Sequence, residues 1–333
     1  MKTLMIYGAT GYTGKMIAHQ AKKAGLNFVV AGRDKQKLGE LAETLGVSAA
    51  VFTLEDPKLV REQLVDIAVV LNCAGPFAKT AEPLIKACIE NGIDYLDITA
   101  EINVYRLAES LQQSATQAGS MLMPGVGWDV VPTDSLAVTL SRQVKNPQRL
   151  RIALQVAGSM SRGSAISAGE IFSAGLLARV NGELTTKQDA SMGMFDFGLG
   201  AVECAPLSFG DLVTAWHSTS IPNIEMFVHV AGAGFPEGDL SLLPDGPSLD
   251  ELQSTPARAV VEITGADGEV HRAIIDTVNG YAYTPLAAIE AAKRALEGQR
   301  APGFQTPAKV FGDDFALSIP GTRITVLNGQ GNH

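Results

Sequence analysis

Three glycines near the start of the chain have a spacing that suits binding of a nucleotide diphosphate. They follow an apolar run and precede a helical pattern, in a GxxGxxG arrangement instead of the more usual GxGxxG. Gly8 allows a tight turn, Gly11 lets backbone N–H groups approach phosphate, and Gly14 lets the helix pack closely on the strand. The positive end of the helix dipole then faces the phosphates. The residues predicted to hold the diphosphate are Gly8, Thr10, Gly11, Tyr12, Thr13 and Gly14. The alternative is a strand-to-helix turn without a ligand.

The end of the second predicted strand indicates which nucleotide is bound. A site that prefers NAD has Asp or Glu there, which accepts a hydrogen bond from the ribose 2′-OH. This chain has Gly32-Arg33 instead. A guanidinium suits a 2′-phosphate through a bidentate contact, so Arg33 predicts NADP(H) as the cofactor. Lys35 and Lys37 add positive potential and Asp34 partly offsets it. The alternative is that Arg33 only points to solvent.

Two residues are the leading candidates for proton donation or substrate anchoring, namely Asp129 and Tyr95. Both follow or end predicted parallel strands, and ligands lie beyond the carboxyl ends of such strands. His217 is a weaker third candidate, with a packed or surface histidine as the alternative. Asp129 has an alternative role as the N-cap of the helix that Pro132 begins, and Tyr95 as a plain strand residue. No HExxH, CxxC or GxSxG pattern occurs, so no metal site is predicted and hydrolase chemistry lacks support.

The elements that must position these residues alternate between strands and helices over the first 125 residues. This alternation predicts a doubly wound parallel sheet, the Rossmann fold of dinucleotide-binding domains. The predicted strands are 3–7, 28–31, 49–53, 68–72, 95–98 and 120–123, and the predicted helices are 14–23, 35–45, 57–64, 80–91 and 102–118.

Beyond residue 127 the pattern changes to that of a second α+β domain with a mainly antiparallel sheet. Its predicted strands are 149–157, 211–216, 224–230, 259–264 and 270–279, and its predicted helices are 132–144 and 168–180. Residues 232–256, rich in Gly, Pro, Ser and Asp, predict a long surface excursion. We therefore expect an NADP-binding domain over 1–126, a substrate and dimerisation domain over 127–283, and over 284–333 a helix (284–296) and tail that pack back on the first domain.

The composition excludes several other classes of protein. The chain is 46% hydrophobic and 18% charged, which excludes an intrinsically disordered protein. A net charge of −9 argues against a nucleic-acid partner held through phosphates. The longest apolar runs are far short of the roughly 18 residues of a membrane span, and the apolar run at the start is too short for a signal peptide. Three widely separated cysteines fit a reducing compartment, so a cytoplasmic location is predicted.

Three later motifs give the chain a resemblance to a known family. They are Asn72-Cys73-Ala74-Gly75-Pro76-Phe77, Tyr95-Leu96-Asp97-Ile98-Thr99-Ala100-Glu101 and Gly127-Trp128-Asp129-Val130-Val131-Pro132-Thr133-Asp134. With the glycine loop and Arg33, they make the chain resemble the saccharopine dehydrogenase-like NADP-binding reductases, in particular the branch of the trans-acting enoyl reductases. The resemblance implies that Asn72, Ala74, Gly75, Pro76 and Phe77 run along the cofactor. The chain departs from the family where Ala100 replaces Gly, Trp128 replaces Phe and Val130 replaces Ser.

The substrate is predicted from charge and from aromatic residues. Residues 152–235 contain three basic and seven acidic residues, whereas a dicarboxylic amino acid would need paired Arg or Lys. An apolar cavity could instead be lined by Met192, Met194, Phe195, Phe197, Trp216 and Phe227, although these residues could equally fill a core or a dimer interface. We therefore predict an NADPH-dependent oxidoreductase that transfers hydride to an apolar or conjugated small molecule, with an enoyl-type C=C favoured. C=N or C=O reduction and a non-catalytic NADP-sensing regulator stay open, and so does a homodimer formed through the second sheet.

Overall fold

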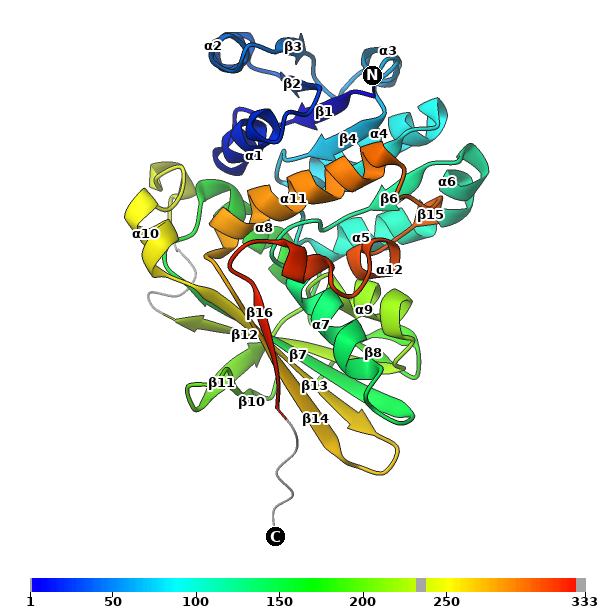
Figure 1. The fold of residues 1–333 in the computed structure, drawn as a ribbon, viewed down its shortest axis with the longest axis vertical. Helices are drawn as coiled ribbons and strands as arrows, with labels where there is room; N and C mark the ends of the chain where they lie inside the picture. Colours follow the sequence, from blue (N-terminus) through cyan, green and yellow to red (C-terminus); the bar gives the residue numbers. More distant parts are fainter. Residues whose placement is uncertain (1, 232–237, 328–333) are drawn as a thin grey trace.

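The computed structural model describes residues 2–231 and 238–327 and contains two sheets, one above the other in Figure 1. The upper sheet is entirely parallel and is built almost wholly from the first 123 residues. The lower sheet is mixed and comes from the rest of the chain. The prediction of a doubly wound sheet followed by an α+β domain is therefore confirmed. Among the described residues, no helix is both long and apolar enough to span a membrane.

The first sheet has the strand order β15-β6-β5-β4-β1-β2-β3. Its strands are β1 (Leu4–Tyr7), β2 (Phe28–Gly32), β3 (Ser48–Val51), β4 (Val69–Asn72), β5 (Asp94–Asp97), β6 (Met121–Met123) and β15 (Gly303–Phe304). Strand β1 pairs with β2 on one side and β4 on the other, and it is buried throughout. Strands covered on both faces have nearly continuous apolar sequences, which is why they were predictable. The order reverses between β1 and β4, and ligands bind at such a switch point.

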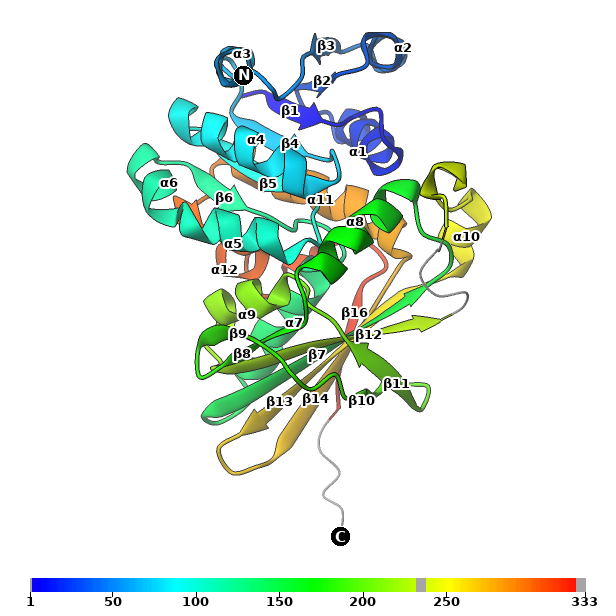
Figure 2. The same ribbon diagram turned by 180° about the vertical axis from the view of Figure 1, so that it is seen from behind.

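Helices cover both faces of this sheet. They are α1 (Tyr12–Lys23), α2 (Lys35–Leu45), α3 (Pro57–Gln63), α4 (Phe77–Asn91), α5 (Ile102–Ser110), α6 (Gln112–Ala118) and the late helix α11 (Gly280–Glu297). Helices α1 and α11 pack together on one face, and α4 and α5 lie on the other, as Figures 1 and 2 show. The single helix predicted over 102–118 is interrupted at Leu111, so it forms two shorter helices.

The second sheet has nine strands, with the order β10-β11-β12-β7-β13-β14-β16 and a β8–β9 hairpin attached to β12. The strands are β7 (Pro147–Ala157), β8 (Leu177–Val180), β9 (Glu183–Thr186), β10 (Gly193–Asp196), β11 (Ala201–Pro206), β12 (Asn223–Ala231), β13 (Ala257–Gly265), β14 (Val270–Thr277) and β16 (Arg323–Leu327). Helices α7 (Val131–Ser141) and α9 (Asp211–Thr219) cover one face. Only the β7–β12 pair is parallel among the pairings described in this sheet.

Two predicted elements of the second domain are wrong. The strand predicted over 211–216 is helix α9, in which the five consecutive residues Asp211 to Ala215 are all buried. Such a fully buried run does not show the helical period. The helix predicted over 168–180 is shifted: α8 spans Arg162–Ser173, begins at the N-cap Ser161, and is followed by β8. Strands β9, β10, β11 and β16 were not predicted.

The last part of the chain contacts both domains. After α11, β15 extends the first sheet, and α12 (Pro307–Phe311) and η2 (Phe315–Ser318) pack on α7. Strand β16 then pairs with β14 in the second sheet, so the tail does not pack on the first domain alone. The predicted domain boundaries stay a prediction. Of the predicted excursion, residues 232–237 lie outside the described residues, and the rest contains η1 (Leu240–Leu242) and α10 (Leu249–Ser254).

Candidate functional site

The glycine loop joins β1 to α1 with a geometry that only glycine allows at two positions. Gly8 has φ +82°, and a Cβ there would lie 2.7 Å from the backbone nitrogen of Ala74. A Cβ on Gly14 would lie 2.2 Å from the carbonyl oxygen of Gly8. Both glycines are therefore required so that the loop, the helix and the segment after β4 can approach one another.

The same loop leaves the N-terminus of α1 open for an anion. Helix α1 begins at Tyr12, its N-cap is the exposed Gly11, and no side chain caps the first turn. A Cβ built on Gly11 would meet only the Gly8 carbonyl oxygen, at 3.4 Å. The first-turn amides of a twelve-residue helix therefore point out beside a glycine cradle, and these residues fit a dinucleotide diphosphate.

Arg33 lies directly after β2, where a 2′-phosphate would be held. Its side chain is exposed, and no carboxylate within residues 2–231 and 238–327 pairs with it. The neighbouring Asp34 is already engaged, because it caps α2 by accepting from the Lys37 amide at 3.1 Å and lies 3.7 Å from the Lys37 Nζ. The free guanidinium fits recognition of an additional phosphate.

The predicted cofactor loop after β4 is braced from inside by Asn72. Its side chain is fully buried, with Oδ1 accepting from the Ala74 amide at 3.0 Å and Nδ2 donating to Thr80 Oγ1 at 3.0 Å. Phe77 is also buried, whereas Gly75 is exposed and Ala74 and Pro76 are half-buried. Asn72 and Phe77 therefore shape the loop, and Ala74, Gly75 and Pro76 present its outer surface.

Glu101 ties this loop to both domains, a role that the sequence did not predict. Its Oε1 accepts from the Phe77 amide at 2.9 Å and from Ser167 Oγ at 2.7 Å, and its Oε2 accepts from the Ala78 amide at 2.7 Å. The carboxylate thus caps the N-terminus of α4 and holds α8 of the second domain against it. The one available signal was its place shortly after β5, at the N-cap position of α5.

Tyr95 lies in the interior, where it bonds neighbouring polar side chains. The prediction had placed it facing the acceptor. The side chain is fully buried, and its hydroxyl donates to Asp97 Oδ2 at 2.9 Å and accepts from Asn72 Nδ2 at 3.2 Å. Burial raises the pKa of Tyr95 well above its usual range, so the hydroxyl keeps its proton. Burial also raises the pKa of Asp97 to about 7, although Asp97 accepts from the Thr99 and Gly125 amides.

Asp129 is the carboxyl group that remains free at this edge of the sheet. It follows β6, is half-buried, and no hydrogen-bond donor in the described part of the chain reaches its carboxylate. Burial alone raises the pKa of Asp129 to about 6. The alternative role as a helix cap is wrong, because the N-cap of α7 is Val130 and no side chain caps it.

His217 is engaged in contacts between two elements, and its weaker role as a catalytic candidate stays a prediction. Its Nε2 is 2.7 Å from Glu109 Oε1 of α5, and its ring packs on Phe304 of β15 with centroids 4.7 Å apart. The hydrogen bond with His217 lowers the pKa of Glu109. The histidine therefore joins α9 to the edge of the first sheet.

The predicted apolar cavity is not formed by the residues named for it. Phe195, Phe197 and Phe227 are buried in a small separate cluster on the face of the second sheet opposite α7. Met192 and Met194 are about half exposed, at 52% each. The alternative of a core role is confirmed for the three phenylalanines.

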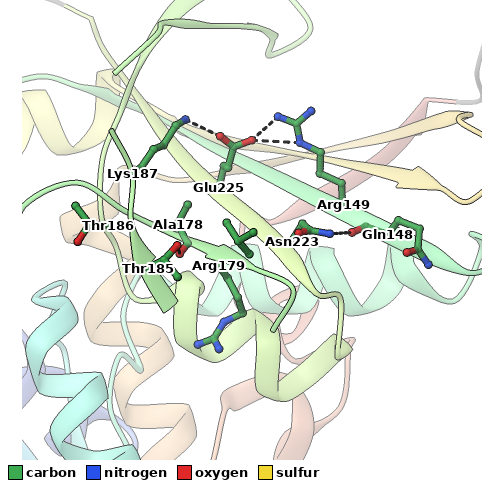
Figure 3. A pocket seen from close by; sticks show the side chains of 10 residues that line it. Gln148, Arg149, Ala178, Arg179, Thr185, Thr186, Lys187, Asn223 and Glu225 are labelled. Atoms are coloured by element: carbon green, nitrogen blue, oxygen red, sulfur yellow. Dashed lines mark hydrogen bonds and ion pairs between the residues drawn. The ribbon is translucent and has the colours of Figure 1, made fainter. Parts of the chain in front are cut away.

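A hollow of about 380 Å³ lies on the second domain, away from the glycine loop (Figure 3). It is lined by the β8–β9 hairpin and the adjoining ends of β7 and β12. Its charged groups already pair, because Glu225 accepts from Lys187 at 2.5 Å and from Arg149 Nε at 3.2 Å. Arg179 donates to the carbonyl oxygens of Leu212 and Gly182. The charged side chains of the hollow are therefore all engaged by other groups of the chain, although its three cations outnumber its one carboxylate.

Comparison with known proteins agrees with this geometry. Residues 4–123 match the family described as saccharopine dehydrogenase NADP binding domain. A human saccharopine dehydrogenase-like oxidoreductase is 31% identical over 163 residues, which cover 43% of this chain and 38% of the human protein. A trans-acting enoyl reductase of Mycobacterium bovis is 30% identical over 148 residues, which cover 42% of this chain and 35% of that protein. The chain thus spans less than half the length of either relative.

Over nearly its whole length the fold resembles saccharopine dehydrogenase (L-Glu forming) from Saccharomyces cerevisiae. The TM-score is 0.66 at 15% identity, and the match covers 98% of this chain and 100% of the yeast chain. The fold and the glycine loop define a Rossmann protein with a dinucleotide-binding domain. More narrowly, residues 4–123 match the saccharopine dehydrogenase NADP binding domain, in agreement with the resemblance found in the sequence.

Proposed function

We propose that this protein is an NADPH-dependent oxidoreductase in which Asp129 meets the acceptor. The observation that carries the proposal is a free, half-buried carboxyl group at the same sheet edge as the glycine loop and the loop after β4. Gly8, Thr10, Gly11, Tyr12, Thr13 and Gly14 would hold the diphosphate, Arg33 the 2′-phosphate, and Ala74, Gly75 and Pro76 would line the cofactor. A bound nicotinamide supplies hydride transfer.

Asp129 has the properties of a proton donor. A general acid works best when its pKa lies near the working pH, and burial brings the pKa of Asp129 to about 6. Its carboxyl is not consumed by a structural hydrogen bond, in contrast to Glu101 and Asp97. The protonated fraction decreases as the pH rises above about 6, so reduction should become slower in that range.

For the acceptor we propose an uncharged small molecule, with an enoyl-type C=C as the first choice. The ionisable groups placed around the site, Asp97, Glu101 and Asp129, are acidic, and no cation lowers the pKa of Asp129. A dicarboxylic amino acid would meet repulsion here in place of the paired cations it needs. The similarity to a protein named trans-acting enoyl reductase supports the C=C choice. The predicted apolar cavity gives no support to this choice, because the phenylalanines named for it are packed in the separate cluster of the second sheet.

The test is a screen of enoyl, imine and carbonyl compounds that follows loss of NADPH absorbance, repeated with NADH. We expect turnover with an enoyl compound, faster with NADPH than with NADH. Asp129→Asn should lower this turnover about a hundredfold or more and leave NADPH affinity nearly unchanged. Asp267→Asn is the matched control, because Asp267 lies in the β13–β14 turn and, within the described residues, accepts only a local bond from the Glu269 amide.

Each other outcome has a defined meaning. Equal loss of NADPH affinity in Asp129→Asn would make the residue structural and refute its proposed role. Turnover with imines or carbonyls alone would replace the enoyl acceptor by C=N or C=O. NADPH binding without oxidation across the whole panel would refute the enzyme and favour an NADP-sensing regulator, which needs no proton donor.

A further inference from the structure

A short segment of the second domain lies across the start of α1. This segment, residues 243–247, is called the strap here. Tyr12, the first residue of α1, donates from its hydroxyl to the Pro247 carbonyl oxygen at 2.6 Å. A Cβ on Gly246 would lie 2.6 Å from the Tyr12 ring, so the strap backbone rests on that ring. The strap therefore contacts the residue that follows Gly11 of the glycine loop.

Arg162 holds the other end of the strap. Its Nε and Nη2 donate to the Leu243 carbonyl oxygen at 3.1 and 2.6 Å, and Nη2 lies 3.3 Å from Asp245 Oδ1. Its backbone N–H also donates to the Asp245 carbonyl oxygen at 3.3 Å. Arg162 is the first residue of α8, the helix that Ser167 joins to Glu101. The guanidinium fork thus fixes the strap to the element that borders the loop after β4.

Tyr281 connects the two contact points. Its hydroxyl accepts from the Ser161 amide at 2.8 Å and donates to Ser164 Oγ at 2.8 Å. Its ring meets Tyr12 edge-on, with centroids 5.7 Å apart. In Figures 1 and 2, α10 lies beside α8 and close to α1, so the strap before α10 bridges the two domains.

The end of the strap that leads into α10 is firmly anchored. Ser248 and Glu251 form a capping box at the start of α10. Ser159 Oγ donates to Glu251 Oε1 at 2.8 Å, and Asn279 Nδ2 donates to Thr255 Oγ1 at 2.7 Å. Movement of the strap therefore does not require α10 to move, and the contacts that must break are those of Tyr12 and Arg162.

We propose that the strap closes the dinucleotide site and that Arg162 is the positioning residue that latches it. The inference rests on the proposed binding of NADP(H) at the glycine loop. The first-turn amides of α1 face the diphosphate, and the strap lies on the first residue of that turn, so the cofactor passes the strap when it enters and when it leaves. Release of Leu243 and Asp245 by Arg162 opens the path in both directions.

The test measures NADPH association and dissociation rates by stopped-flow fluorescence. In Arg162→Ala, both rate constants should rise about tenfold, while the dissociation constant changes less than about threefold, because a gate affects both directions. Arg162→Lys keeps the charge but loses the fork, so it should show the same change to a smaller extent. Arg142→Ala is the control, since Arg142 pairs with Asp313 at 2.5 Å, away from the strap, and should leave both rates unchanged.

A second measurement needs no cofactor. Hydrogen exchange of the strap amides in the cofactor-free protein should become faster in Arg162→Ala and not in Arg142→Ala. Rates and exchange unchanged in Arg162→Ala would overturn the strap while leaving cofactor binding intact. A rise in dissociation alone would also overturn it, because Arg162 would then be a plain ligand contact. Absence of NADPH binding to the wild-type protein would refute the proposed function and the strap with it.

Discussion

Asp129→Asn should make the cofactor-free protein more stable at alkaline pH, although it removes the proposed proton donor. Burial raises the pKa of Asp129 from 3.8 to about 6 in the folded state. The folded protein therefore holds this proton more tightly than the unfolded chain. The favourable contribution is complete below pH 3.8 and is lost as the pH rises through about 6. Above that pH the ionised carboxylate destabilises the folded state.

The size of the effect follows from the pKa difference. One pKa unit corresponds to about 1.4 kcal/mol, so the full shift gives about 3 kcal/mol. The carboxyl is partly open to solvent, which reduces this value, and we expect between about 1 and 3 kcal/mol. Asparagine does not titrate in this range. The unfolding free energy of the variant, relative to that of the wild-type protein, should therefore be higher at about pH 8 than at about pH 4 by this amount.

Urea unfolding followed by circular dichroism at several pH values measures the effect. The quantity of interest is the unfolding free energy of Asp129→Asn minus that of the wild-type protein. This difference removes the contributions of other buried carboxyl groups, such as Asp97, which titrate in both proteins. Asp267→Asn, in an exposed turn outside the site, is the control for replacing one carboxyl group by an amide. A difference for Asp129→Asn that does not vary with pH would refute the reasoning, because the carboxyl would then titrate as a solvated group.

Three further predictions concern other residues. Arg33→Ala should weaken NADPH binding about tenfold or more and leave NADH binding unchanged in fluorescence titrations, and equal loss for both would contradict 2′-phosphate recognition. Glu101→Gln should lower the unfolding free energy by about 2–4 kcal/mol in urea, because an amide NH₂ would face the α4 amides; a loss under about 0.5 kcal/mol would contradict this. His217→Gln should keep turnover within about twofold of the wild-type value, since its partner is Glu109; a hundredfold loss would restore it as a catalytic residue.

The first domain and the position of the site were predictable from local patterns. Strands β1 and β4 are short apolar runs bounded by a glycine loop and a Gly-Pro loop, and a parallel sheet leaves its ligand at the ends of such strands. This rule places Asp129 at the site without knowledge of its neighbours. The helix α9 was not predictable in the same way, because Asp211 to Ala215 are all buried and hide the helical period.

The roles of individual side chains depend on partners that are distant in sequence. Tyr95 and His217 are residue types that often transfer protons, but Asn72 bonds the Tyr95 hydroxyl and Glu109 bonds the His217 Nε2. Glu109 is 108 residues from His217, and Pro247 is 235 residues from Tyr12. No spacing rule connects such pairs, so the brace around Tyr95 and the strap became visible only in three dimensions.

The return of the chain to both sheets limits how the two halves can move. Helix α11 leads from the second domain onto the first, β15 adds to the first sheet, and β16 ends beside β14 in the second. A hinge opening of the two domains would have to bend the chain at each of these crossings and would strain the strand pairing at both sheet edges. Large rigid-body opening of the two domains is therefore disfavoured. Small molecules should enter and leave through the movement of short surface segments, which leaves both sheets unchanged.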